Sequence, residues 1–212
     1  MNIFSYDSKF SQLFLKLSYA CWLNMMWMIC SLPIITIGAS TTALYSVTLK
    51  IADEKESNIT KQFITAFRSN FKQATRMWLL LLLAGILIGG DFYVVLHIRS
   101  MSSGSLAIMW TLNLALLIAV SIIYVVILVY VFPLIARFEN TDKAMIKNSL
   151  LIGIHYLFCT ITVVAIHFVM FYAVVAIFTP LILFGEGLCA LLSSYMLINV
   201  FRLISYRPEE EE

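Results

Sequence analysis

The chain has 212 residues, of which 61% are hydrophobic and 12% are charged, and its mean hydropathy is +0.92. Soluble domains average about 45–50% apolar and about 25% charged residues, so this composition excludes an ordinary soluble fold and predicts a membrane protein. The formal net charge of +2 is too small for a nucleic-acid-binding surface, and we expect no nucleic-acid partner.

Long apolar stretches predict an all-α fold, a polytopic transmembrane helix bundle that makes residues 1–212 a single integral membrane domain. Residues 13–32 have the length of about 20 residues that crosses a bilayer, and Pro33 ends this stretch. Residues 39–52 are short and rich in small residues, which favours a short return helix inside the bundle. Four further long stretches cover residues 77–97, 106–135, 154–179 and 188–203.

Residues 57–76 lie between two apolar stretches and sort into two opposite stripes. At about 100° per residue, one face of a helix carries Ile59, Phe63, Phe67 and Phe71, and the other carries basic residues. The pattern predicts a basic amphipathic cytoplasmic helix at the membrane interface, with its phenylalanines in lipid or against a protein partner. The candidate residues for docking a partner or lipid are Lys61, Phe63, Phe67, Arg68, Phe71, Lys72 and Arg76.

The basic residues also predict the topology, because cytoplasmic loops collect Lys and Arg. Six passes put nearly all basic residues on one side and leave Arg99 on the other. Five passes, with residues 39–52 in the interface, move Lys9 and Lys16 outside and fit less well. We therefore favour a multi-pass protein of the bacterial cytoplasmic membrane with both termini cytoplasmic. A cleaved signal peptide is the weaker alternative, because the first apolar run is too long for one.

Two short segments repeat one pattern, PIITIGASTTALYS (residues 33–46) and PLILFGEGLCALLS (residues 180–193). Each has a proline, a glycine five residues later and Ala-Leu-x-Ser at the same offset. Related halves of a membrane protein or two hairpins with similar turns explain the pattern equally well. Structural turns are expected at Pro33, Gly38, Pro133, Pro180 and Gly185.

Ionisable and polar residues inside the apolar stretches are the candidates for chemistry, because burying them in a membrane is costly. The candidate intramembrane polar site consists of Asp91, Asn113 and His167. Asp91 fits either a structural lock with a neighbouring helix or a cation or proton site in a wet cavity. Asn24 and Asn113 fit hydrogen bonding between helices. Glu186, in an outer turn, is expected to be solvated.

Known catalytic motifs are missing from the sequence: no phosphate loop, zinc pair, nucleophile elbow or set of metal-spaced acidic residues is present. We therefore predict no catalytic residues, no metal, no cofactor and no enzyme activity. The four cysteines lie in apolar stretches and fit inert thiols. Residues 137–149 predict a second helical loop on the cytoplasmic face, with Thr141 or Asp142 as its N-cap. Residues 205–212 read as an acidic, solvated tail.

Three segments together resemble the YesL-like family of uncharacterised bacterial integral membrane proteins. They are DSKFSQLFLKLSYACWLNMMWMICSLPIITIGASTTALYSVTLK (residues 7–50), FITAFRSNFKQATRMWLLLL (residues 63–82) and YVFPLIARFENT (residues 130–141). The resemblance implies a cytoplasmic-membrane protein without established activity, whose genes often lie near those for carbohydrate uptake and breakdown. It supplies no catalytic residues.

The leading hypothesis is a non-enzymatic accessory or scaffold protein associated with carbohydrate uptake. Its basic aromatic helix and the loop at residues 137–149 would dock a partner such as a sugar-uptake permease, with the lipid bilayer as its surroundings. The alternative is a small transporter or channel with a path near Asp91 and His167. The sequence does not indicate an oligomeric state.

Overall fold

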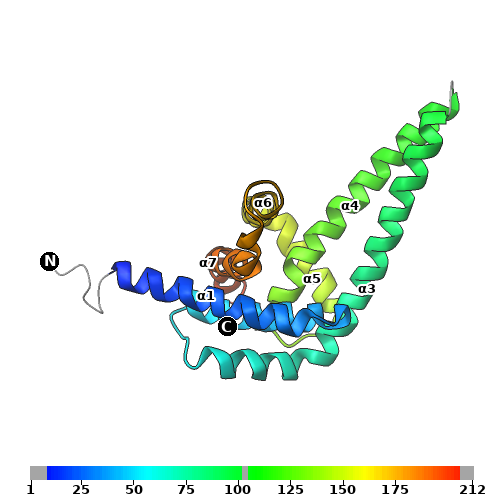
Figure 1. Cartoon of the computed structure of the whole chain (residues 1–212). Helices are drawn as coiled ribbons and strands as arrows, with labels where there is room; N and C mark the ends of the chain where they lie inside the picture. Colours follow the sequence, from blue (N-terminus) through cyan, green and yellow to red (C-terminus); the bar gives the residue numbers. More distant parts are fainter. Residues whose placement is uncertain (1–8, 102–104, 206–212) are drawn as a thin grey trace, which may run out of the picture.

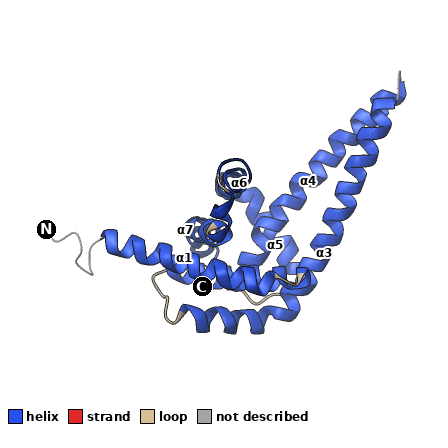
Figure 2. Ribbon diagram, in the orientation of Figure 1, coloured by secondary structure: helices blue, strands red, loops and turns tan. Residues whose placement is uncertain are grey.

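A computed structural model describes residues 9–101 and 105–205, and every secondary-structure element in this part of the chain is helical (Figure 2). The long helices are α1 (Lys9–Ser31), α2 (Ile37–Ala52), α3 (Ile59–Met101), α4 (Ser105–Arg137), α5 (Asp142–His155), α6 (Leu157–Tyr172) and α7 (Gly185–Ser205). Short helical turns connect them, η1 (Ile34–Thr36), η2 (Ala173–Ile177) and η3 (Thr179–Leu183).

Six helical stretches in this part of the chain are long and apolar enough to cross a membrane. The predicted all-α, polytopic fold is therefore confirmed, and the chain has the make-up of a multi-pass membrane protein. The stretch predicted to be short is also the shortest of the six, at 19 residues. The six are Phe10–Ser31, Ile34–Ala52, Ile59–Arg99, Ser105–Arg137, Leu157–Ile177 and Gly185–Ser205.

The amphipathic segment is not a separate helix, because it forms the first part of α3, a helix of 43 residues. In Figure 1, α3 starts along the bottom of the view, then turns and rises beside α4 as a long hairpin. No Pro or Gly lies between Arg76 and the apolar residues that follow, so nothing in the sequence ends the helix there. At about 1.5 Å per residue, α3 is about twice as long as a hydrocarbon core is thick.

Helix α2 lies in the centre of the molecule, in contact with α1, α3, α4 and α7. Small side chains allow this close packing, as expected for helices in a membrane. A Cβ atom added at Gly38 would lie 2.5 Å from Trp78 Cβ and 2.6 Å from the Ala74 carbonyl oxygen. The indole of Trp78 also donates a 2.7 Å hydrogen bond to the Ile34 carbonyl. The start of α2 is therefore fixed against the middle of α3.

Both proline-containing turns include a short 3-10 helix. Helix α1 ends two residues before Pro33, and α2 follows after the η1 turn. Pro180 lies in η3, and α7 follows directly at Gly185. The predicted turns at these prolines, each followed by a helix that opens near a glycine, are confirmed. The predicted turn at Pro133 is wrong, because this residue is buried inside α4, near its end, and α4 continues to Arg137.

Several residues predicted to share one side of the membrane lie together at one end of the molecule. We call this region, which contains Lys16, Asp53, Glu54, Lys55 and Arg202, the charged end. Lys16 of α1 pairs with Glu54 at 3.8 Å. Arg202 of α7 contacts Asp53 at the end of α2, and Lys55 is 2.6 Å from the same carboxylate. This grouping agrees with the predicted clustering of basic residues. The membrane side on which it lies, and the choice of six passes over five, stay predictions.

Asp53 is the central acidic group of the charged end, with a side chain only 3% exposed. Its hydrogen bonds from Arg202 and Lys55 stabilise the ionised carboxylate and lower the pKa of Asp53 to about 2.

Helix α5 begins at Asp142, and its N-cap is Thr141, whose hydroxyl accepts a hydrogen bond from the Ala144 backbone N–H. The prediction of a cap at Thr141 or Asp142 is therefore confirmed at Thr141. The predicted acidic tail lies almost entirely outside the described residues.

We expect Gly38→Ala to lower the free energy of unfolding in detergent by about 1–3 kcal/mol, because the new methyl group meets backbone and Cβ atoms of α3. Gly89→Ala is the matched control. A Cβ atom at Gly89 meets nothing within 4 Å, so this change should be neutral or stabilise α3 by up to about 1 kcal/mol. Thermal unfolding of both variants measures the difference. Equal loss of stability would contradict the close packing of α2 on α3.

The ion pairs of Asp53 predict a dependence of stability on pH. The pKa of Asp53 is lower in the folded protein than its ordinary value of 3.8, so the carboxylate adds stability above that value. This stability should disappear as the pH falls from about 4 to about 2. Unfolding of the wild type and of Asp53→Asn should therefore differ at pH 6 and converge near pH 2. A constant difference across this range would rule out the pairing.

Candidate functional site

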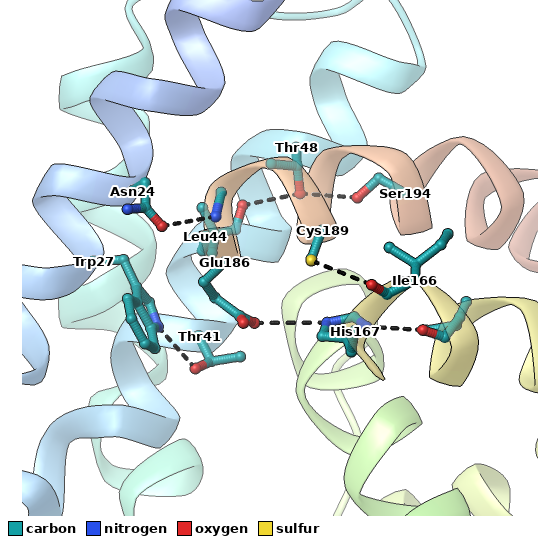
Figure 3. A network of polar contacts seen from close by, with 12 residues as sticks. Asn24, Trp27, Thr41, Leu44, Thr48, Ile166, His167, Glu186, Cys189 and Ser194 are labelled. Carbon is teal, nitrogen blue, oxygen red and sulfur yellow. Dashed lines mark hydrogen bonds and ion pairs between the residues drawn. The ribbon is translucent and has the colours of Figure 1, made fainter. Parts of the chain in front are cut away.

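His167 and Glu186 form an acid–base pair between α6 and the first turn of α7 (Figure 3). The imidazole Nε2 atom lies 3.7 Å from a carboxylate oxygen of Glu186. The Nδ1 atom lies 2.8 Å from the Val163 carbonyl oxygen on the preceding turn of α6. Both side chains are partly exposed, 32% for His167 and 27% for Glu186, so the pair is open to a cavity.

In this geometry a proton can lie between the Nε2 atom of His167 and the carboxyl group of Glu186. A carbonyl oxygen only accepts hydrogen bonds, so the Nδ1 atom of His167 carries a hydrogen and donates it to Val163. Nε2 therefore faces the carboxyl group of Glu186. Without a further proton, an imidazole lone pair would face a carboxylate, which is unfavourable. One proton on either Nε2 or the Glu186 carboxyl group removes this repulsion.

The pair lines a largely apolar cavity of about 440 Å³ between α1, α2, α3, α4, α6 and α7. On the α2 side, Thr41 accepts a 3.0 Å hydrogen bond from the Trp27 indole, as Figure 3 shows. A cavity of this size with few polar groups is typical of sites for small molecules. Its aromatic and polar lining consists of Trp27, Thr41, Tyr45, Trp78, Phe132, His167, Phe168, Phe171 and Glu186.

Asn24 of α1 holds the turn that positions Glu186. Its amide nitrogen donates to the carbonyls of Ile182, at 3.0 Å, and Leu183, at 2.8 Å. Its amide oxygen accepts a 2.9 Å hydrogen bond from the Gly187 backbone N–H. A Cβ atom at Gly187 would lie only 2.2 Å from the Ala20 carbonyl oxygen, so glycine allows this approach. The prediction that Asn24 hydrogen-bonds between helices is confirmed.

The predicted polar site of Asp91, Asn113 and His167 is not assembled. Asp91 is exposed on α3 and Asn113 is exposed on α4, and neither lines the cavity that contains His167. The expectation of a solvated Glu186 is also wrong, because its carboxylate faces His167. The flanking glycines at 185 and 187, next to the turn at Pro180, were the only signal in the sequence for a tightly packed Glu186.

The candidate docking residues on the first part of α3 divide between the interior and the surface. Phe63 is fully buried in the protein core, so its prediction as a lipid or partner contact is wrong. Phe67 is partly buried against the same core, and its ring meets the edge of the more exposed Phe71 ring at 5.5 Å. The basic side chains of this segment are all exposed, namely Lys61, Arg68, Lys72 and Arg76.

Helix α3 is joined to the start of α5 next to this basic surface. Arg76 pairs with Asp142 at 3.1 Å. Gln73 donates hydrogen bonds to the Asn140 carbonyl, at 2.7 Å, and to the Asp142 carboxylate, at 3.0 Å. In contrast, Lys61, Arg68 and Lys72 form no ion pair within residues 9–101 and 105–205. The first part of α3 is therefore joined to the start of α5 through Gln73 and Arg76, and it carries three further basic side chains without an ion pair in the described parts of the chain.

The described residues contain no group of three or more His, Cys, Asp or Glu side chains that could hold a metal ion. His167 and Glu186 are only two such ligands, and a bound metal usually needs at least three from the protein. The four cysteines are free thiols, with Cys159 and Cys189 buried.

Comparison with known proteins finds similarity to families without assigned activity. Residues 20–92 match a family model described as a protein of unknown function, DUF624. The chain is also 25% identical over 165 residues to the uncharacterised protein YteU of Bacillus subtilis (strain 168), covering 77% of this chain and 71% of that protein. No solved structure matches significantly. These matches fit an uncharacterised family, and the specific likeness to YesL stays a prediction.

Proposed function

We propose that the chain is a non-enzymatic accessory or scaffold protein of the cell membrane that docks an acidic partner surface at its charged end. The observation that supports this proposal is the orientation of the first part of α3. Its apolar stripe packs against the protein's own core through Phe63 and Phe67, while the basic face stays exposed.

This orientation favours a protein partner over simple lipid anchoring. A helix that lies in the headgroup region binds lipid mainly through an apolar face inserted into the acyl boundary. Here that face is largely occupied by protein, and only Phe71 and Ile64 remain exposed on the segment. What the segment offers is a row of charges on a rigid support. Such a surface steers and orients an oppositely charged partner.

The class of protein that we propose as the partner is inferred from the resemblance to the YesL-like family alone. The fold does not identify it. A component of carbohydrate uptake, such as a sugar-uptake permease, is the partner that this resemblance implies. A permease would also cover part of the long α3–α4 hairpin, whose outer residues are apolar and exposed. Lipid or a membrane partner is the only environment in which so much exposed apolar surface is stable.

A small transporter is the second candidate function, and the pair of His167 and Glu186 supports it. Ionisable residues that pair inside a membrane protein and face a cavity are typical of proton and substrate paths. The pair lies in a cavity of about 440 Å³. In this form of the hypothesis Glu186 takes the role that we predicted for Asp91 from the sequence.

We expect the double variant Arg68→Glu, Lys72→Glu to lose its partner in the cell while its bundle stays folded. The physical reason is that both side chains are exposed and form no ion pair within residues 9–101 and 105–205, so reversing their charge repels an acidic surface without disturbing the core. In-cell crosslinking followed by mass spectrometry of the co-purified proteins measures the loss. Arg68→Lys, Lys72→Arg is the charge-preserving control and should keep the partner. Unchanged association of the reversed variant would end the docking proposal.

The transporter candidate makes a separate prediction in reconstituted vesicles. Proton uptake, followed with an enclosed pH-sensitive dye under an imposed gradient, should fall at least about tenfold in Glu186→Gln. Asp91→Asn should leave uptake unchanged, because Asp91 does not line the cavity. No proton or solute flux through the intact protein would argue against transport and leave the accessory role.

A further inference from the structure

A second cavity, of about 730 Å³, opens at the charged end between the end of α2, the start of α3 and the end of α4. Its volume lies within the range of about 300–1,000 Å³ that is typical of small-molecule sites. Unlike the cavity at His167, it is lined mainly by polar side chains. The polar residues of the lining are Ser46, Lys50, Ser57, Asn58, Lys61, Gln62, Thr65, Ser69, Asn70, Gln73, Arg137, Glu139 and Asn140.

Positive charge dominates this polar cavity. Three basic side chains line it, Lys50, Lys61 and Arg137, against one acidic side chain, Glu139. None of the three basic side chains forms an ion pair in the described parts of the chain. Lys16, Lys55 and Arg202 at the same end are each paired with a carboxylate. The lining therefore carries a net positive charge, which a bound anion would complement.

Several neutral side chains around these cations are held in place by the helices. Asn58 caps the start of α3 by accepting a 3.0 Å hydrogen bond from the Lys61 backbone N–H. Asn70 donates to the Ala66 carbonyl at 3.1 Å, and Gln73 donates to the Asn140 carbonyl at 2.7 Å. The remaining polar atoms of these amides, together with the hydroxyls of Thr65 and Ser69, offer both donors and acceptors. The lining therefore suits a ligand with hydroxyl groups in addition to an anionic group.

We propose that this cavity binds a phosphate group that carries a hydroxylated organic substituent. A phosphate group suits a lining with three cations, because Arg and Lys both bind phosphate through charge-assisted hydrogen bonds. Helix α3 begins directly after two lining residues, Ser57 and Asn58, and the N-terminus of a helix favours anions. The amide and hydroxyl side chains then bind the substituent.

The phosphate has two possible sources with the same chemistry, a soluble phosphorylated polyol and the headgroup of phosphatidylglycerol. The cavity is polar and lies at helix ends, where headgroups and solvent both reach. An acidic peptide would need a longer groove, and the partner surface proposed above uses Arg68 and Lys72, which do not line this cavity. The binding site and the docking surface can therefore be tested independently.

The experiment measures binding of two probes to the purified full-length protein in detergent by isothermal titration calorimetry. The probes are glycerol 3-phosphate and dihexanoyl phosphatidylglycerol, with glycerol as the phosphate-free control. Binding of the first probe identifies a soluble ligand, and binding of the lipid probe alone identifies a headgroup site. Either result supports the proposal, provided that glycerol does not bind. Failure of both probes to bind would overturn it.

Three variants locate the site. Lys50→Gln and Arg137→Gln should each weaken binding by at least about tenfold, because each removes a charge-assisted hydrogen bond. Thr65→Phe should weaken binding by filling the cavity without changing its charge. Arg68→Gln, an exposed cation outside the cavity, is the control and should bind as the wild type does. Equal weakening by Arg68→Gln, or no weakening by the other variants that remain folded by thermal unfolding, would overturn the proposal.

Discussion

The close approach of α2 to its neighbours is the constraint on which the rest of the structure depends. Helices in a membrane gain little from the hydrophobic effect when they associate, so they depend on dense packing and hydrogen bonds. Gly38 allows the backbone of α2 to meet α3 at Ala74 and Trp78. Because α2 is surrounded by four helices, its position fixes the start of α3, the end of α4 and the face of α7 that points inward.

Helix α7 is held at both ends, so it contributes residues both to the charged end and to the cavity that contains His167. Near its C-terminal end, Arg202 contacts Asp53 beyond the end of α2. At its N-terminal end, Asn24 of α1 binds the Gly187 backbone and the turn before it. Between these points the Ser194 hydroxyl donates to Thr48 of α2 at 2.8 Å. The carboxylate of Glu186 is therefore placed against His167 by contacts that lie outside the cavity itself (Figure 3).

The sequence predicted the features that depend on local chemistry. Apolar length identified the helices, Pro33 marked the end of α1, and Thr141 marked the start of α5. Features that depend on which helices pack together could not be predicted in this way. Helical spacing put Phe63 and Phe67 on one face, but it could not tell lipid from the chain's own core. The same limit applied to Glu186, because its partner lies on a different helix.

Asp91 and Glu186 show why intramembrane charge alone does not identify a site. Both were ionisable residues next to glycines at the ends of apolar stretches. Asp91 is exposed on α3, whereas Glu186 is on a helix that contacts α1, α2 and α6. A carboxylate becomes part of a site when the backbone that carries it is fixed from several sides.

The charged end contains two kinds of positive charge, and the difference bears on function. Arg202 and Lys55 bind the nearly buried Asp53, and the contact of Arg202 stabilises the fold by joining α7 to the end of α2. Lys50, Lys61 and Arg137 line a polar cavity and form no ion pair within residues 9–101 and 105–205. Natural sequences depart from locally favourable choices mainly at functional sites. These cations, which have no ion-pair partner in the described parts of the chain, are therefore the ones on which we base the proposed anion site.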